Sequence, residues 1–177
     1  MKDLDIITTM NERNKNVIIE QIKAEGKIKA FSTYAEILDK RAYLTMDAEG
    51  NLKRKETSII LPIFAFFDDE EILAESILKY GDIKERQILE KIDRFSNIEV
   101  AKVKENLMKT MFNGSIDFAK KYAKELFLRD KKEFFRLMAT FVTIGNSESL
   151  KSLNMIAFER LMEENADRKS TRLNSSH

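Results

Sequence analysis

The feature that most constrains the fold is a helix-start signature that occurs four times between residues 68 and 133. In each case an Asp or Ser is followed three residues later by Glu: Asp68 and Glu71, Asp82 and Glu85, Ser96 and Glu99, Asp130 and Glu133. The first side chain can accept a hydrogen bond from a free N–H of the first turn, and the Glu can reach back to the N–H of the cap residue. Apolar residues at helical spacing follow each pair, and Ser115 and Ser147 mark two further starts. The pattern predicts six helices, over residues 69–80, 83–95, 97–112, 116–128, 131–144 and 148–164.

The connections between these helices are only a few residues long, which favours antiparallel neighbours. Start positions two helices apart are separated by 32 to 34 residues, and the whole chain has only five Gly and one Pro. A helical hairpin of this length is the unit of α-solenoids, although the units here share little residue identity. The expected fold is therefore mostly α, with antiparallel helical hairpins stacked as a short α-solenoid-like array or packed as an irregular bundle.

One predicted helix, over residues 131–144, is apolar around most of its circumference. A helix of this kind is normally buried on several sides. We therefore expect it to be the most buried helix, with Phe134, Met138, Phe141 and Val142 almost fully covered.

The first 67 residues are less regular. Residues 4–25 have helical spacing that is weakened by the polar stretch 11–16, and Gly26 ends the segment. Thr33 and Glu36 predict the start of a short helix to about residue 41. The turn-forming residues 47–51 lie between segments rich in β-branched and apolar residues, which predicts one β-hairpin near residues 42–61. Pro62 suits the first turn of a helix through residue 67. We expect one domain over residues 1–67 and a six-helix array over residues 68–166.

The last eleven residues, 167–177, read DRKSTRLNSSH. The string is similar over its whole length to the in-frame translation of a widely used sequencing adapter. The resemblance implies that 167–177 is a non-native tail, that native sequence stops near Ala166, and that the chain is a truncated fragment. Without this tail the chain has 28 Lys and Arg against 29 Asp and Glu, and it loses its single His.

The composition excludes several kinds of chemistry. The chain has no Cys, and its only His, His177, lies in the tail. Thiolate and imidazole catalysis, as well as the usual zinc and haem ligands, are therefore missing. The acidic run 68–71 is typical of a helix start rather than a magnesium site. A calcium loop that begins at Asp47 needs Gly at its sixth position and Glu at its twelfth, where this chain has Leu52 and Ser58. We predict no catalytic, cofactor-binding or metal-binding residue, and no cofactor.

Two basic clusters are candidate contacts for anions or nucleic acid. They are Lys53, Arg54 and Lys55 beside the predicted hairpin turn, and Lys120, Lys121 and Lys124 in the predicted helix 116–128. The interpretation that we favour is a non-enzymatic protein–protein interaction or scaffold module whose partner is another protein. A nucleic-acid-binding module that uses the basic N-terminal hairpin is the second interpretation. A fragment of an enzyme with its catalytic residues in the missing C-terminal part is the third.

The second interpretation rests partly on a resemblance. Residues 17–28, VIIEQIKAEGKI, are similar to the first helix and strand of winged-helix domains. The chain has no apolar segment of signal-peptide or membrane-spanning length, which predicts a cytoplasmic protein with no membrane partner. The abundance of Lys, Ile, Asn and Glu suggests a bacterial origin.

Overall fold

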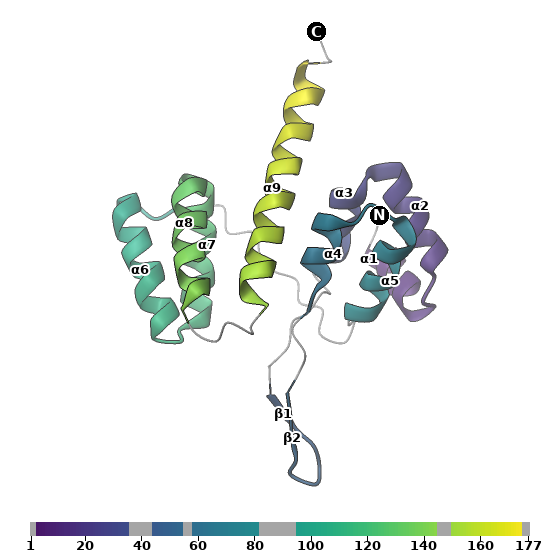
Figure 1. Cartoon of the computed structure of the whole chain (residues 1–177), viewed down its shortest axis with the longest axis horizontal. Coiled ribbons are helices and arrows are strands. Elements are labelled where there is room, and N and C mark those ends of the chain that lie inside the picture. The colour runs from purple at the N-terminus through teal and green to yellow at the C-terminus, as the bar shows by residue number, and fades with distance from the viewer. Residues whose placement is uncertain (1–2, 36–43, 55–57, 82–94, 145–149, 175–177) are drawn as a thin grey trace. The chain divides into compact units, whose positions relative to one another are not determined.

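The computed structural model describes residues 3–35, 44–54, 58–81, 95–144 and 150–174. As predicted, this part of the chain is mostly helical (Figure 1). Its elements are α1 (Asp3–Asn11), α2 (Lys15–Glu25), α3 (Lys27–Tyr34), β1 (Leu44–Met46), β2 (Leu52–Arg54), α4 (Ile60–Phe66), α5 (Glu70–Tyr80), α6 (Val100–Phe112), α7 (Ile116–Arg129), α8 (Lys131–Thr143) and α9 (Lys151–Asn174). None of the helices in these ranges is long and apolar enough to cross a membrane.

The chain divides into two compact units. The first unit comprises Met1–Leu89 together with Ile156–His177, and the second comprises Glu90–Met155. The division therefore runs within α9. It does not coincide with the expected boundary at residues 67 and 68, because α5 packs against α2, α3 and α4.

The core of the first unit lies between α1–α5 and the part of α9 that belongs to this unit. Ile18, Phe64, Leu73 and Ile77 are completely buried, and the Phe64 ring lies 4.8 Å from the ring of Phe31. Burying one such side chain contributes about 1.5–3 kcal/mol. This unit, and not the helix at 131–144, holds most of the fully buried side chains of the described residues.

Local sequence explains how the first helices are separated. The chain turns between α1 and α2, where Arg13 has a φ of 50° and the Asn14 side chain accepts a hydrogen bond from the N–H of Val17. This turn lies in the polar stretch that weakens the predicted helix 4–25. Gly26 joins α2 to α3 with φ 87° and ψ 154°, a conformation open almost only to glycine. Pro62 lies in the first turn of α4, as predicted.

The expected start at Thr33 is wrong. Thr33 lies inside α3, and its hydroxyl donates to the carbonyl of Lys29. Local hydrogen bonding of this kind is compatible with a helix interior as well as with a cap. The rest of that predicted helix, residues 36–41, lies outside the described residues.

Two of the four cap pairs act differently from the prediction. Asp69, not Asp68, caps α5 by accepting from the N–H groups of Glu71 and Ile72. Asp68 instead accepts from Lys27 Nζ at 2.8 Å. The Lys27 ammonium also lies 3.8 Å from Glu164 on α9, so it connects α3 with two other segments of the first unit.

The pair of Ser96 and Glu99 does not cap a helix as predicted, whereas Asp130 of the pair with Glu133 does. The helix expected from residue 97 begins at Val100, and Ser96 is not its cap. Asp130 does cap α8 by accepting from the N–H of Glu133. Asp82, Ser147 and the predicted helix 83–95 lie outside the described residues.

The second unit contains α6, α7 and α8, which lie side by side (Figure 1). α7 packs against both of the other helices, and Val103, Leu107 and Leu126 are fully buried among them. The rings of Phe127 and Phe134 meet edge to face at 5.4 Å between α7 and α8.

The prediction that α8 is covered on nearly all sides is wrong. Phe134 is buried, but Met138, Phe141 and Val142 are only half-buried. Among the described helices of this unit, α7 rather than α8 packs against both of the others. The buried residues Phe134, Phe135 and Leu137 lie in the first two turns of α8, and the half-buried residues lie toward its C-terminal end.

The described residues also contain two short strands and a long last helix. β1 and β2 pair antiparallel with Thr45 opposite Lys53, over three residues in each strand. α9 continues to Asn174, well beyond the predicted end at residue 164. No Gly or Pro occurs in α9 to stop it.

Candidate functional site

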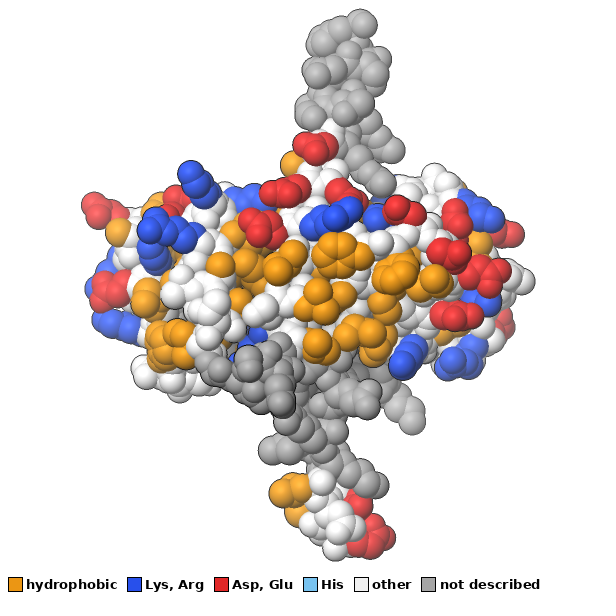
Figure 2. All heavy atoms as spheres, viewed as in Figure 1, with side chains coloured by type: hydrophobic (Ala, Val, Ile, Leu, Met, Phe, Trp, Pro, Cys, Tyr) orange, Lys and Arg blue, Asp and Glu red, His pale blue; other side chains and the backbone are white. Residues whose placement is uncertain are grey.

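Charge separates the two units. Residues 90–155 hold 13 Lys and Arg against 9 Asp and Glu, a net charge of +4. The first unit holds 18 against 21, a net charge of −3. Lys and Arg side chains are prominent over the α6–α8 unit in Figure 2, and Asp and Glu side chains over α1–α5. Because residues of the second unit also line two surface cavities of about 350 and 290 Å³, we take it as the candidate functional site.

The first surface, which we call the apolar groove, is a cavity of about 290 Å³ among the three helices of the second unit. Small side chains on α7, those of Ala119 and Ala123, give it depth. Its lining is almost entirely apolar: Leu107, Thr110, Met111, Gly114, Ile116, Ala119, Lys120, Ala123, Met138 and Phe141. A smaller cavity of about 50 Å³ shares Met111 and Phe141 with it and extends it along α6 and α8.

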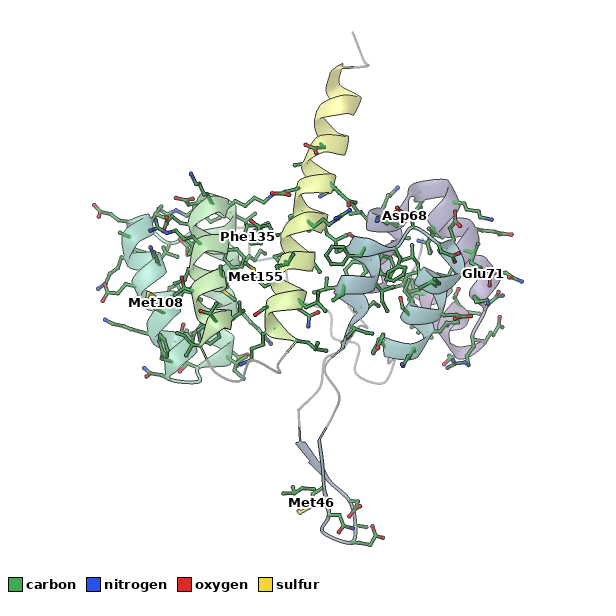
Figure 3. The ribbon with its side chains drawn as sticks, in the orientation of Figure 1. Met46, Asp68, Glu71, Met108, Phe135 and Met155 are labelled. Atoms are coloured by element: carbon green, nitrogen blue, oxygen red, sulfur yellow. The ribbon has the colours of Figure 1, made fainter. Side chains whose placement is uncertain are left out.

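Exposed apolar side chains stand around this groove. Ile116 is 66% exposed and Phe112 is 60% exposed. Met108 on α6 is also exposed, whereas Phe135 on α8 is buried (Figure 3). Neighbouring exposed apolar groups of this size are more typical of binding surfaces than of ordinary solvent-facing helices.

The second surface, which we call the aromatic cavity, lies on the opposite side of α7 and has a volume of about 350 Å³. Its lining combines aromatic rings with charged groups: Phe95, Ser96, Phe118, Lys121, Tyr122, Lys124, Glu125 and Leu128. Lys121 Nζ lies 5.6 Å from the centre of the Phe118 ring, within the range of a cation–π contact.

A hydrogen-bond network forms one wall of the aromatic cavity. Glu125 Oε1 accepts from the N–H of Ser96 at 3.0 Å, from its hydroxyl at 2.6 Å and from Arg129 Nη1 at 2.8 Å. Arg129 also donates to the carbonyl of Ile98 at 2.9 Å. The network holds residues 96–98 against α7 and thereby places Phe95 at the cavity.

The same network controls the charge of Glu125. Burial by itself would raise the pKa of this carboxyl, but the hydrogen bonds from Ser96 and Arg129 outweigh burial and hold the pKa below its usual value. Glu125 is therefore ionised at neutral pH, and the Arg129 guanidinium balances its charge.

An ion pair joins the outer helices of the unit. Lys104 Nζ on α6 lies 2.6 Å from Glu133 Oε2 on α8, and this contact, together with Arg136, holds the pKa of Glu133 below its usual value. The pair closes one end of the three-helix unit beside the cap of α8.

The side chains of only some of the predicted contact residues belong to the described part of the chain. Lys120, Lys121 and Lys124 are all exposed on α7, with Lys120 at the apolar groove and the other two at the aromatic cavity. The backbones of Lys53 and Arg54 lie in β2, but their side chains and all of Lys55 lie outside the described residues.

Sequence reasoning missed the aromatic cavity and the Ser96–Glu125 contact. Ser96 and Glu125 are 29 residues apart, and the local cap pattern of Ser96 pointed to another role. The only local signal was the spacing of Phe118, Lys121 and Tyr122, which puts three side chains on one helix face.

No group of three or more acidic, His or Cys side chains that could hold a metal ion occurs in the described ranges. Comparison with protein-family models, curated proteins and solved structures finds no match.

Proposed function

We propose that this chain is a non-enzymatic interaction module built from helical hairpins in a solenoid-like arrangement, and that its apolar groove binds an amphipathic helix of a partner protein. The observation that carries the proposal is the groove itself: about 290 Å³ of almost entirely apolar space that the three helices leave open. Helix-in-groove binding uses a cavity of this kind for apolar side chains spaced three and four residues apart.

The lining suits a partner of variable shape. Met111 and Met138 contribute flexible, polarisable side chains to the groove, and Met108 adds a third at its extension. Methionine adapts to irregular apolar partners better than branched side chains do. Three methionine side chains in one small unit support recognition of a helix rather than of a rigid small molecule.

Charge complementarity indicates the chemistry of the partner. Lys120 lies at the groove, is exposed, and makes no ion pair within the described residues. The unit around it has a net charge of +4. We therefore expect the bound helix to carry Asp or Glu beside its apolar stripe, because opposite charges favour encounter and orientation.

The test uses the full chain and two labelled helical peptides with the same apolar stripe, one flanked by Glu and one by Lys. Fluorescence anisotropy should show that the Glu peptide binds at least about tenfold more tightly. Ile116→Gln and Lys120→Gln should each weaken its binding. Ile72→Gln, which changes an exposed apolar residue on α5 of the first unit, is the matched control and should have no effect.

Three results would contradict the proposal. The first is equal binding of the two peptides, and the second is loss of binding in Ile72→Gln alone. The third is self-association of the chain that Ile116→Gln abolishes, since the groove would then be an interface between copies. The nucleic-acid interpretation of the β1–β2 region stays a prediction, as does that of an enzyme fragment.

A further inference from the structure

We propose that the aromatic cavity is a second, separate binding site, and that it takes a nucleotide unit of single-stranded nucleic acid. The base would lie against the exposed aromatic faces of Phe118 and Phe95. The phosphate would lie beside Lys121. This site is on the side of α7 away from the apolar groove and shares no lining residue with it.

The first argument is the availability of the aromatic faces. Phe118 is 59% exposed and Phe95 is 52% exposed, although large aromatic side chains are normally well covered. Phe118 contacts no other aromatic ring within the described residues; its recorded contact is with the Lys121 ammonium. An exposed ring beside a cation is the pairing that proteins use to stack a base and hold its phosphate.

The second argument is that the side chains are already positioned. Phe118, Lys121 and Tyr122 are three and four residues apart on α7, so the rigid helix presents them on one face. The Glu125 network fixes residues 96–98 on the same helix and so sets the position of Phe95. The backbone positions of these side chains are therefore fixed before a ligand binds.

The third argument is charge and size. Among the described lining residues the only carboxylate is that of Glu125, which is bonded to Arg129, so the Lys121 ammonium is the cation beside Phe118 that can meet a phosphate. A volume of about 350 Å³ is within the range of small-ligand sites and suits one nucleotide rather than a folded surface. An acidic peptide would use the lysines but would leave the flat aromatic faces without a stacking partner.

The test measures binding of the full chain to fluorescein-labelled dT12, to a 12-base-pair duplex and to free AMP, at 50 and 200 mM salt. The single strand should bind best, because its bases are unstacked and can reach the rings. Phe118→Ala should weaken dT12 binding about five- to a hundredfold through lost stacking, and Lys121→Gln should weaken it and reduce the salt dependence.

Two control variants keep the interpretation clear. Lys102→Gln removes an exposed Lys of the same unit that is bonded to Glu105 and lies outside the cavity, and it should leave dT12 binding unchanged. Ile116→Gln, which changes only the apolar groove, should also leave it unchanged, so the two proposals fail separately. Circular dichroism checks that each variant is folded.

Each outcome decides the assignment. Tighter binding of AMP than of dT12, with the same loss in Phe118→Ala, would assign the cavity to a free nucleotide instead of a strand. Loss of dT12 binding in Lys102→Gln as large as in Lys121→Gln, with no effect of Phe118→Ala, would show only diffuse attraction to a basic unit and overturn the site. Absence of binding to all three probes would also overturn it.

Discussion

Truncation of Phe64 tests the position of the main core. Phe64 on α4 is completely buried and its ring packs on that of Phe31 at 4.8 Å. Phe66, two residues along the same helix, is 45% exposed, and its described ring contact is Arg160 at 5.1 Å. The two residues therefore offer the same chemical change in two different environments.

The magnitudes follow from burial. Phe64→Ala should cost about 3–5 kcal/mol, because it removes a buried ring and leaves a cavity. Phe66→Ala should cost about 1 kcal/mol or less, since little apolar area is lost and an exposed cation–π contact is weak. With a urea slope of about 2 kcal/mol/M, a loss of about 4 kcal/mol lowers the unfolding midpoint by about 2 M.

The assay is urea unfolding followed by far-ultraviolet circular dichroism, which suits a helical chain without Trp. The slope of the transition should stay the same in both variants, so that the midpoints can be compared directly. Equal midpoints for Phe64→Ala and Phe66→Ala, or a loss below about 1 kcal/mol for Phe64→Ala, would refute the placement of the core around α4.

Two further predictions concern the backbone and the pH response. Gly26→Ala should lower the free energy of unfolding by about 1–3 kcal/mol, because Gly26 has φ 87° and ψ 154°, a conformation that costs energy for a residue with a Cβ. The control is Gly81→Ala, because Gly81 has φ −74° and ψ 139°. Equal losses of the two variants in thermal or urea unfolding would contradict this account. The lowered pKa of Glu125 means that the stability it contributes is present above its unfolded pKa of about 4.3 and is lost as the pH falls through its folded pKa. Glu125→Gln should therefore be destabilising at pH 7 and much less so at pH 3, and a difference that does not change with pH would rule out this role for the carboxylate.

Local sequence predicted two helices of the second half, α7 and α8, closely. α7 and α8 begin and end within one residue of the expected positions, because each has an apolar stripe and a short connection. The Asp130 side chain caps α8, whereas the Ser115 side chain makes no cap hydrogen bond at the start of α7. The position of Pro62 in α4 and the break near Asn14 were also readable. These features depend on residues a few positions apart, so the chain needs no tertiary contact to express them.

Cap details were less predictable where a distant residue competed for the same side chain. Asp68 accepts a hydrogen bond from Lys27, which is 41 residues away in the sequence. The neighbouring Asp69 caps α5 instead. Ser96 forms a hydrogen bond with Glu125 on α7 and does not cap the helix that follows it in the sequence. For Asp68, the Lys27 ammonium is a charged donor that forms a stronger hydrogen bond than a neutral backbone N–H does, whereas the Ser96 hydroxyl donates to the ionised Glu125.

The candidate site shows the same division between local and distant information. The sequence by itself determined that α7 carries Lys120, Lys121 and Lys124 on exposed positions, because a basic run on an amphipathic helix turns toward solvent. Only the tertiary structure decided that α7 lies between α6 and α8. That arrangement places Lys120 at the apolar groove and the other two lysines at the aromatic cavity. It also leaves Phe141 half-buried. The physical reason is that helical periodicity defines which side chains share a face, whereas the partner of that face depends on packing between segments far apart in the chain.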